Sequence, residues 1–318
     1  MVKRLILFLV LVLFSSCTRH PYKKTFVISG TYLTVTSPDK RASGIVYDEF
    51  KRLNKIFNIY DKNSEVSRLN NTYNRPFGVS DEMIELISLS KELYRITGGY
   101  FDVSKGRDYS LWKDVIAGKE KIRTVSSSEV SDLTKEGGME YIKVDRKDKT
   151  VIISKRGLLL DFSAIAKGYM VDKAAMRLRK AGVKSALINA GGDIYCLGKD
   201  SGKPWKIGIK EPSAKGGIID TVLLSDEAAA TSGDYEQFID YKGRRYSHII
   251  NPKTGYPVNN GVVSVTVVTK NCTSADGLAT AFFAMGPDNI KDFLSKVPYT
   301  MKIFVVVKTG GEEKIYVF

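Results

Sequence analysis

One apolar run limits what this chain can form. Leu5 to Phe14 is an unbroken stretch of ten apolar residues. A helix needs about 20 apolar residues to cross a bilayer core of roughly 30 Å, so this run is too short to span one. No other stretch is long enough either. We therefore expect the rest of the chain to fold as one soluble body with its own core.

The apolar run has the layout of an export signal. The Lys3-Arg4 pair precedes it, and Ser15, Ser16 and Cys17 follow it. A basic start, an apolar centre and small residues before a cysteine are typical of a bacterial lipoprotein signal, in which the cysteine becomes the lipidated N-terminus. A plain secretory signal with an incidental cysteine is the alternative. We expect Cys17 to carry the lipid.

Cleavage before Cys17 would give a lipid-anchored protein on the periplasmic side, with the inner membrane favoured and the outer membrane as the alternative. Removing residues 1–16 leaves 318 − 16 = 302 residues with a net charge of 47 − 35 = +12. Such a charge suits a body held near anionic lipid headgroups. Residues 17–24 would be the lipidated tether and residues 25–318 the folded domain. We expect no nucleic acid partner, because the sequence has no basic stripe interleaved with aromatic residues.

The small number of histidines and cysteines excludes much metal chemistry. The whole chain has two histidines and three cysteines, which excludes zinc sites of the Cys₄ or Cys₂His₂ type. An enzyme of this composition must rely on carboxylates, hydroxyls, backbone groups, Lys and Arg, or an added cofactor. His20 lies in the tether, so His248 is the one histidine of the folded domain. We expect Cys196 and Cys272 to be buried as small apolar side chains rather than joined.

The pattern of apolar residues predicts the α+β class. Strands outnumber helices, and the two do not follow a strict β-α-β alternation. We expect one compact domain with mixed sheets and a ligand cleft where the glycine-rich turns gather. The expected strands are 25–29, 31–36, a hairpin over 141–154, 185–190, several more up to 268, 302–307 and 314–318. The expected helices are 46–57, one from Ser80 to Gly98, one from Ser163 to Gly182, and one near 274–285.

Two segments place charged side chains at the start of predicted helices. Asp161 follows an apolar strand, and Lys167 comes six positions later. The pair can bind a ligand, or it can be a capping carboxylate and a solvated lysine. Asp276 and Thr280 are four residues apart, which puts them on one face of a helix. A carboxylate and a hydroxyl together suit a hard cation such as Mg²⁺, although a helix-start Asp with a back-bonded Thr would look the same.

Other candidates lie at turns. His248 follows a strand and precedes Asn-Pro-Lys-Thr-Gly255, as a site residue on a loop would. The Gly-Gly pair of Asn189 to Asp193 lets the backbone approach a ligand, but it is neither a dinucleotide fingerprint nor a P-loop. Tyr60 and the run Tyr100, Phe101 and Asp102 offer aromatic rings near tight turns. Such rings suit a flat aromatic ligand, and core packing explains them nearly as well.

Taken in order, these segments resemble the FAD:protein FMN transferase (ApbE) family of bacterial lipoproteins. The family often has Met where this chain has Ser29. The matching pieces spread over nearly the whole mature chain and comprise Ser29 to Thr31, Asp61 to Arg68, Gly99 to Asp102, Asp161 to Gly168, Asp172, Asn189 to Asp193, Ser247 to Gly255 and Ser274 to Thr280.

The resemblance implies a reaction. Members cleave FAD, transfer its FMN half to a Thr or Ser hydroxyl of a target protein as a phosphoester, and release AMP. Their targets are typically subunits of membrane-bound redox complexes. By this resemblance Mg²⁺ is held by the side chains of Asp276 and Thr280 and the carbonyl of Ala164, and Asp276 also counts with His248, the candidate base, as catalytic. The implied FAD contacts are Ser29, Tyr60, Tyr100, Phe101, Asp102, Asp161, Lys167 and Ile250.

Two other functions remain open on the same residues. Water can replace the protein hydroxyl, which gives an Mg²⁺-dependent FAD pyrophosphatase with FMN and AMP as products. A lipid-tethered protein that binds FAD without turnover is the third interpretation. The Asp276 and Thr280 pair favours catalysis, because storage of a flavin does not need a catalytic metal.

Overall fold

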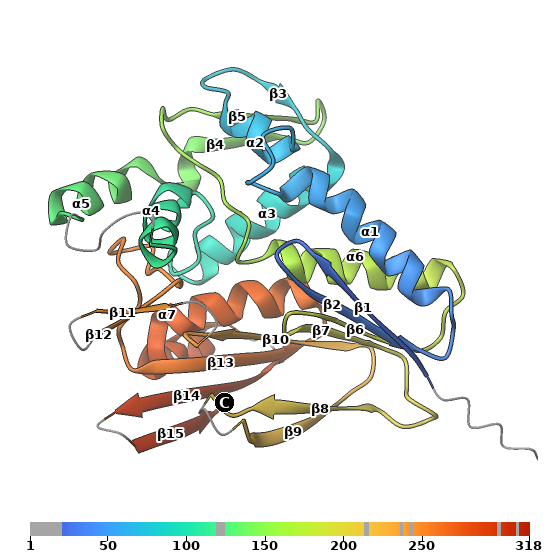
Figure 1. Ribbon diagram of the computed structural model, residues 1–318. Coiled ribbons are helices and arrows are strands. Elements are labelled where there is room, and N and C mark those ends of the chain that lie inside the picture. Colours follow the sequence, from blue (N-terminus) through green and yellow to red (C-terminus); the bar gives the residue numbers. More distant parts are fainter. Residues whose placement is uncertain are drawn as a thin grey trace, which may run out of the picture.

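An eight-stranded antiparallel sheet runs through the molecule (Figure 1). The computed structural model describes residues 21–118, 125–212, 216–235, 238–241, 244–297, 300–309 and 312–318. The sheet order is β1-β2-β6-β7-β10-β13-β14-β15. Its strands are β1 (Tyr22–Ile28), β2 (Thr31–Ser37), β6 (Ala186–Ala190), β7 (Asp193–Leu197), β10 (Glu227–Gly233), β13 (Val262–Thr269), β14 (Lys302–Thr309) and β15 (Glu312–Val317). All neighbouring strands are antiparallel.

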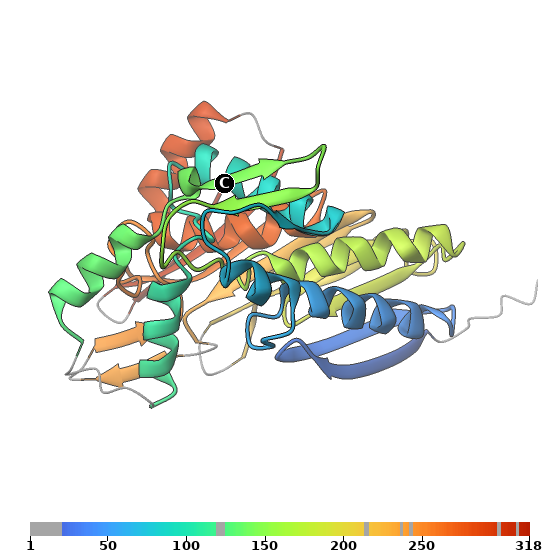
Figure 2. The ribbon, with the colours of Figure 1, turned by 90° about the horizontal axis from the view of Figure 1, so that it is seen from above.

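Three long helices cover one face of this sheet. They are α1 (Ala42–Phe57), α6 (Ala166–Lys180) and α7 (Cys272–Lys296). Seen from above, α1 and α6 run side by side over the strands (Figure 2), and α6 also packs on α7. In α1 the buried residues Val46, Phe50, Leu53 and Phe57 recur every three or four positions, which gives the helix one apolar face. The main core lies between these helices and the sheet.

The opposite face of the sheet is covered in part by a hairpin of β8 (Trp205–Lys210) and β9 (Ile218–Leu224). Ala228 and Ala230 of β10 belong to the main core, whereas Ala229 packs with Trp205 and Phe304 in a second cluster. Because successive side chains of a strand point to opposite faces, this alternation shows that both faces of the central strands are buried.

The remaining elements lie above the helices or beside them (Figure 1). A small sheet in the order β3-β5-β4 packs with α3 and α2 near the top. A side cluster around Trp112 and Val130 joins α4 and α5 to the loop that contains Ile250. These elements are α2 (Glu65–Asn70), β3 (Phe77–Gly78), α3 (Asp81–Ile96), α4 (Gly106–Ile116), α5 (Ser127–Glu136), the short helix η2 (Met139–Tyr141), β4 (Ile142–Asp145), β5 (Thr150–Ile153), β11 (Phe238–Tyr241) and β12 (Arg244–Ser247).

The α+β class expected from the sequence is confirmed, and most element starts follow local rules. The Ser80 hydroxyl accepts the amide of Met83 and caps α3, as its sequence predicts. The predicted cap at Ser163 is wrong, because α6 begins at Ala166. The Asp161 carboxylate accepts the Ser163 amide instead, and this bond holds residues 163–165 in a turn before the helix.

Helix α7 continues beyond the predicted end near residue 285. Gly286 has a φ of 75°, outside helical geometry, and Pro287 follows it, so the helix kinks there and resumes. Proline is tolerated at the first position of a helix, since no intrahelical partner awaits its nitrogen there. Within the residues that the structure describes, no helix combines the length and apolar character needed to cross a bilayer. The expected signal segment and Cys17 lie outside the described residues.

Candidate active site

A cleft of about 490 Å³ opens at the end of the sheet where the β1–β2 and β6–β7 turns meet. It draws residues from nearly the whole length of the chain. Its walls combine carboxylates, lysines, hydroxyls, one histidine and aromatic rings. The lining residues are Ser29, Gly30, Thr31, Asn54, Phe57, Asn58, Ile59, Tyr60, Tyr109, Lys113, Asp161, Ser163, Ala164, Ala166, Lys167, Met170, Gly191, Thr231, Ser232, His248, Ile249, Ile250, Asp276 and Thr280.

Tight turns bring two strand ends into the cleft wall. Ser29 and Gly30 form the two-residue turn between β1 and β2, with φ of 53° and 72°. Glycine adopts this left-handed region without strain, and serine does so rarely. At the β6–β7 turn, a Cβ on Gly191 would lie 2.1 Å from the Thr31 hydroxyl. Glycine at position 191 therefore lets the two turns approach each other.

Asp276 and Thr280 lie in the first half of α7 and both line the cleft. Oδ2 of Asp276 accepts the Gly168 amide at 2.9 Å, which fixes the carboxylate against α6. The Thr280 hydroxyl lies 3.2 Å from the Ser232 hydroxyl of β10. The start of α7 is held by Asp172, whose carboxylate accepts the Cys272 and Thr273 amides at 2.8 Å each. Asp276 and Thr280, which the sequence predicts to share a helix face, are therefore held in position by contacts to α6 and β10.

Lys167 lies between two carboxylates. Its Nζ donates to Oδ2 of Asp193 at 2.5 Å and lies 3.8 Å from Oδ2 of Asp276. Both carboxylate side chains are nearly fully buried, at 2% and 6% exposure, whereas the lysine side chain is 32% exposed. One ammonium group thus balances two buried negative charges and still reaches the cleft.

A second lysine, Lys113, neutralises Asp161, and both residues line the cleft. Nζ of Lys113 lies 2.8 Å from Oδ2 of Asp161, and it also lies 5.7 Å from the ring centre of Tyr60. Burial by itself would lower the pKa of Lys113, but the neighbouring Asp161 carboxylate outweighs it and raises that pKa. The lysine therefore stays charged beneath Tyr60, which is 78% exposed at the cleft mouth.

His248 and the residues after it form one side of the cleft. The His248 side chain is half-buried, while Ile249 and Ile250 are buried beside it. The Ile249 amide donates to the Ser247 hydroxyl at 3.2 Å, and the Val258 amide donates to the Ile249 carbonyl at 2.9 Å. These bonds fix the loop that presents the imidazole to the cleft.

The structure brings nine of the sequence candidates into this cleft and leaves three outside its wall. The nine are Ser29, Tyr60, Asp161, Ala164, Lys167, His248, Ile250, Asp276 and Thr280. Phe101 instead packs in the main core, and Asp102 is buried and accepts the Ser104 amide and hydroxyl. The Tyr100 ring carries the Lys253 ammonium 3.9 Å from its centre. Gly98 and Gly99, before these residues, have φ of 59° and 83°, and the chain after them enters the core at Phe101.

The donors at Asp276 and Thr280 fit Mg²⁺ better than a softer metal. In the described part of the chain, no group of three or more His, Cys, Asp or Glu residues gathers as a metal cluster. Mg²⁺ takes oxygen ligands, uses few protein groups and leaves positions for phosphate oxygens. Oδ1 of Asp276 accepts no hydrogen bond from a described residue, and the Thr280 hydroxyl and the Ala164 residue line the same cleft.

Several site residues escape sequence reasoning. Lys113 lies in a weakly patterned stretch, and its partner Asp161 is 48 positions away. Asp193 follows the Gly-Gly pair, but nothing in its neighbours indicates that it pairs with Lys167. Asn54 and Ser232 are also part of the wall. Of these four residues, only Asp193 could have been found from its neighbours in the sequence, because it directly follows the Gly-Gly turn that faces the cleft.

Fold and site together define an α+β protein with a polar cleft suited to a phosphate-bearing ligand. A lysine beside a carboxylate and a hydroxyl that would fit a hard cation suits phosphate, and the aromatic side chains suit a ring system. Residues 29–305 match the model of the ApbE family, and the chain belongs to this family.

Named relatives agree over most of the chain. An FAD:protein FMN transferase of Vibrio cholerae is 34% identical over 276 residues, 84% of this chain and 79% of the relative. One of Haemophilus influenzae is 29% identical over 87% of this chain and 82% of its own length. The crystal structure of the ApbE protein of Thermotoga maritima superposes with a TM-score of 0.82 at 30% identity, covering 93% of this chain and 96% of the other. The flavin transferase ApbE of Vibrio cholerae gives 0.82 at 31%, covering 94% and 97%.

Proposed function

We propose that this chain is an Mg²⁺-dependent FAD:protein FMN transferase. It moves the FMN half of FAD to a Thr or Ser hydroxyl of an acceptor protein, forms a phosphoester and releases AMP. The observation that carries the proposal is the gathering of Lys167, His248, Asp276 and Thr280 around one cleft of about 490 Å³. Family membership and the names of the relatives support the same activity.

Two groups of cleft residues divide the work of binding. Asp161, held by Lys113, presents a fixed carboxylate to hydrogen-bond donors of the substrate, and Tyr60 offers a ring face at the mouth. Lys167 places a positive charge next to the position where the two phosphates would lie. Asp276, Thr280 and the Ala164 carbonyl would hold Mg²⁺, which when bound neutralises charge on the diphosphate as a Lewis acid.

Phosphoryl transfer requires an in-line nucleophile and little other protein chemistry. The acceptor hydroxyl attacks the phosphorus of the FMN half, the bond to the bridging oxygen breaks, and AMP leaves with that oxygen. His248 is the residue of the cleft suited to take the hydroxyl proton, because imidazole accepts protons near neutral pH. The half-buried position of His248 leaves it reachable from outside, as an acceptor protein requires.

Location and acceptor follow as part of this proposal. A lipid on Cys17 would hold the enzyme on the periplasmic side of a membrane. Acceptors would then be subunits of membrane-bound redox complexes with exposed Thr or Ser residues. An FAD pyrophosphatase uses the same cleft with water in place of the acceptor, so the two activities differ only in the nucleophile.

The test is to incubate the purified protein with FAD and Mg²⁺, with and without a candidate acceptor. A transferase releases AMP in step with flavin fluorescence that stays on the acceptor through denaturation. AMP release without an acceptor would indicate the pyrophosphatase. No AMP under either condition, together with tight FAD binding, would reduce the protein to a carrier and contradict the proposal.

Asp276→Asn is the matched variant for this assay. The amide oxygen of Asn can still accept the Gly168 amide, so the fold is retained while the charge at the metal position is lost. We expect AMP release to fall by about a hundredfold or more, since one electrostatic contact in a phosphoryl-transfer site is worth about that much. Full Mg²⁺-dependent activity in Asp276→Asn would remove Asp276 from the metal site.

A further inference from the structure

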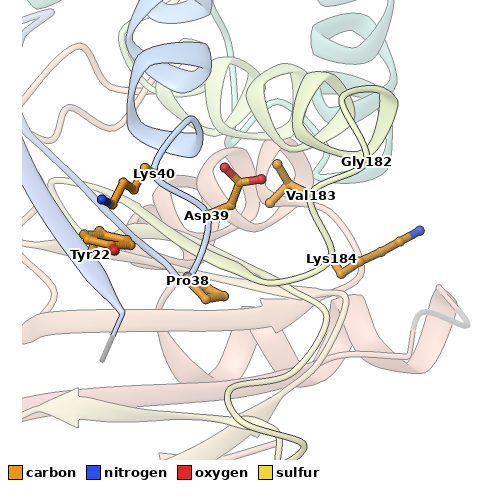
Figure 3. A pocket seen from close by; sticks show the side chains of 7 residues that line it. All are labelled: Tyr22, Pro38, Asp39, Lys40, Gly182, Val183 and Lys184. Carbon is orange, nitrogen blue, oxygen red and sulfur yellow. The ribbon is translucent and has the colours of Figure 1, made fainter. Parts of the chain in front are cut away.

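The end of the sheet opposite the cleft carries a group of lysines around a broad surface hollow. The hollow has a volume of about 910 Å³ and is lined by Tyr22, Pro38, Asp39, Lys40, Gly182, Val183 and Lys184 (Figure 3). It lies where β1 begins, where β2 ends, and where α6 passes into β6. The cleft residues described above do not contribute to it.

Hydrogen bonds tie this end together across four strands. Tyr22 of β1 pairs with Ser37 of β2. The Ser37 hydroxyl donates to the Ser185 carbonyl at 2.6 Å, and the Ser185 hydroxyl donates to the Lys199 carbonyl at 2.7 Å. The strand pairing and these side-chain hydrogen bonds together connect the loops on which Lys40, Lys184 and Lys199 stand.

These three lysines are exposed cations without a carboxylate in contact. Lys40, Lys184 and Lys199 are exposed, and no ion pair joins any of them to a carboxylate in the described ranges. Lys180, the last residue of α6, and Lys203, in the connection between β7 and β8, are exposed as well.

The acidic residues of the same region do not cancel this charge. The Asp39 carboxylate is already held by Arg41 at 2.7 Å, and this hydrogen bond keeps the pKa of Asp39 below its ordinary value. Asp200 lies between Lys199 and Lys203 and accepts from Ser201. The net charge of the surface is therefore positive, which favours an anionic partner.

An aromatic ring stands among these cations. Tyr22 is 47% exposed, and the Lys40 ammonium lies 4.9 Å from its ring centre. Figure 3 shows Lys40 beside Tyr22 and Lys184 extending outward on the other side of the hollow. Tyrosine is enriched in proteins at the headgroup level of a bilayer, where its amphipathic ring fits between apolar and polar surroundings.

The length of chain before Tyr22 limits what can face this surface. Five peptide units separate Cys17 from Tyr22, and an extended chain covers at most about 3.5 Å per residue, or about 17 Å in all. If Cys17 is acylated, as the proposed function assumes, the membrane must lie within that distance of Tyr22. A second copy of the chain does not fit as the partner, because the same lysines would repel each other.

We propose that this end of the molecule, formed by Tyr22, Lys40, Lys184 and Lys199, contacts an anionic phospholipid bilayer. The headgroup phosphates pair with the lysines and occupy the hollow between Lys40 and Lys184. The cleft begins at the Ser29-Gly30 turn, at the other end of β1 and β2. Seven strand residues of about 3.3 Å each hold that turn roughly 20 Å from the contact surface. The active site thus faces away from the membrane, toward an acceptor that projects from it.

Amine labelling of the full-length protein on vesicles tests this surface. The protein is mixed with vesicles of phosphatidylcholine alone or with half phosphatidylglycerol, treated with an amine-reactive reagent, and analysed by mass spectrometry. We expect labelling of Lys40 and Lys184 to fall by about threefold or more on the anionic vesicles, and about 0.5 M salt to reverse the change because it screens exposed charges. Lys291 and Lys296, exposed on the last part of α7, serve as internal controls.

A pair of charge reversals completes the experiment. Lys40→Glu/Lys184→Glu and the control Lys291→Glu/Lys296→Glu change the net charge equally. The readout in both pairs is the labelling of Lys199, which neither pair replaces: its protection on anionic vesicles should be lost in the first pair and kept in the second. Equal labelling of Lys40 and Lys184 on both vesicle types, or equal effects of both pairs, would overturn the proposal. AMP release from FAD, measured in detergent, tests the proposed function separately. If the wild-type protein released no AMP, the labelling result would still stand.

Discussion

At the scale of single residues, the cleft depends on how buried charges are balanced. Lys167 serves two carboxylates, Asp193 and Asp276, and Lys113 serves Asp161. A buried carboxylate without a cation is costly, so each lysine is part of the folded structure before any ligand arrives. The same lysines are the groups available to an anionic substrate.

Removing the shared lysine should therefore lower stability before it affects chemistry. We expect Lys167→Met to reduce the free energy of unfolding by about 1–3 kcal/mol, since it removes the ammonium group that faces the buried Asp193 carboxylate. The double variant Lys167→Met/Asp193→Asn should recover part of this loss. Urea unfolding of the two single variants and the double gives the coupling free energy. Strict additivity of the two changes would show that the two side chains do not interact.

Part of the arrangement of individual residues in the cleft can be predicted from the sequence. Asp276 and Thr280 could be paired from their spacing alone, because one helical turn separates them. Lys113 could not, since its partner is 48 positions away and only the tertiary fold brings them together. Because they follow two glycines, Tyr100, Phe101 and Asp102 look like ligand contacts. Burial of a large aromatic ring in the core is the more common role of such residues. Local sequence patterns therefore identify pairs of residues that line the cleft. They miss the residues that hold these side chains in place through tertiary contacts.

At the scale of elements, the packing of α6 on α7 positions the cleft. A Cβ on Gly168 would lie 2.4 Å from the Cys272 carbonyl oxygen and 2.8 Å from Cβ of Asp276. Glycine at this position lets the two helices approach until the Gly168 amide reaches the Asp276 carboxylate.

Gly168→Ala should separate these helices. We expect a loss of about 1–3 kcal/mol in the free energy of unfolding, the usual cost of overpacking, and a weaker response of AMP release to Mg²⁺. Gly44→Ala in α1 is the matched control, because nothing lies within 4 Å of the added Cβ. Alanine there should stabilise the helix by up to about 1 kcal/mol. Equal stability of the two variants in thermal unfolding would contradict the close helix contact.

Glu49 links α1 to α6 through charge. Its carboxylate is buried and accepts from Arg52 at 2.8 Å and from Arg177 of α6 at 2.9 Å. Burial would raise the pKa of Glu49, but the two guanidinium groups outweigh it and hold that pKa below its ordinary value of 4.5. A lowered carboxyl pKa contributes stability that is fully present above pH 4.5 and is lost as the pH falls through the lower, folded-state value.

Glu49→Gln should expose this pH dependence. At neutral pH we expect the variant to be less stable by about 1.5–3 kcal/mol, because two charge-assisted hydrogen bonds are weakened. The difference from wild type should shrink below pH 4.5, where the wild-type carboxyl also becomes neutral. Chemical unfolding at several pH values measures the difference, and a gap that stays constant down to strongly acidic pH would contradict the lowered pKa.

At the scale of the whole molecule, both faces of the central sheet are covered. Cys196 and Cys272 are both free and buried. Cys196 lies under the β8–β9 hairpin and Cys272 lies in the main core, so each thiol probes one face of the sheet. Burial raises the pKa of Cys196 to about 12, and burial likewise raises that of Cys272 well above its usual range. The sequence predicted two buried thiols, and the structure confirms them.

Thiol labelling should therefore follow unfolding of the two layers. We expect neither Cys196 nor Cys272 to react with iodoacetamide in native buffer on the timescale that modifies a free thiol, because the reactive thiolate is suppressed and covered. Both should react once the chain is unfolded in urea. Mass spectrometry of peptides resolves the two sites. Faster reaction of Cys196 at low urea would show that the hairpin layer opens before the helical layer.

Most strands and the Ser80 cap could be predicted from sequence because their causes are local, whereas the cap expected at Ser163 is wrong. The break at Gly30 between the first two strands, the Ser80 cap and the closing strand pair each depend on neighbouring residues. The order of strands in the sheet could not be predicted, since β2 pairs with β6 after some 150 intervening residues. The position of the cleft depends on that long-range pairing.

This arrangement determines when the protein can first bind its substrate. The cleft takes residues from Ser29 near the beginning and from Thr280 near the end of the chain. Contacts between such distant positions form late, because closing long loops is entropically unfavourable and slows folding. A ribosome releases the beginning of the chain long before α7 exists. A nascent chain therefore has no complete pocket during most of its synthesis. Flavin cannot assist its folding until α7 has emerged.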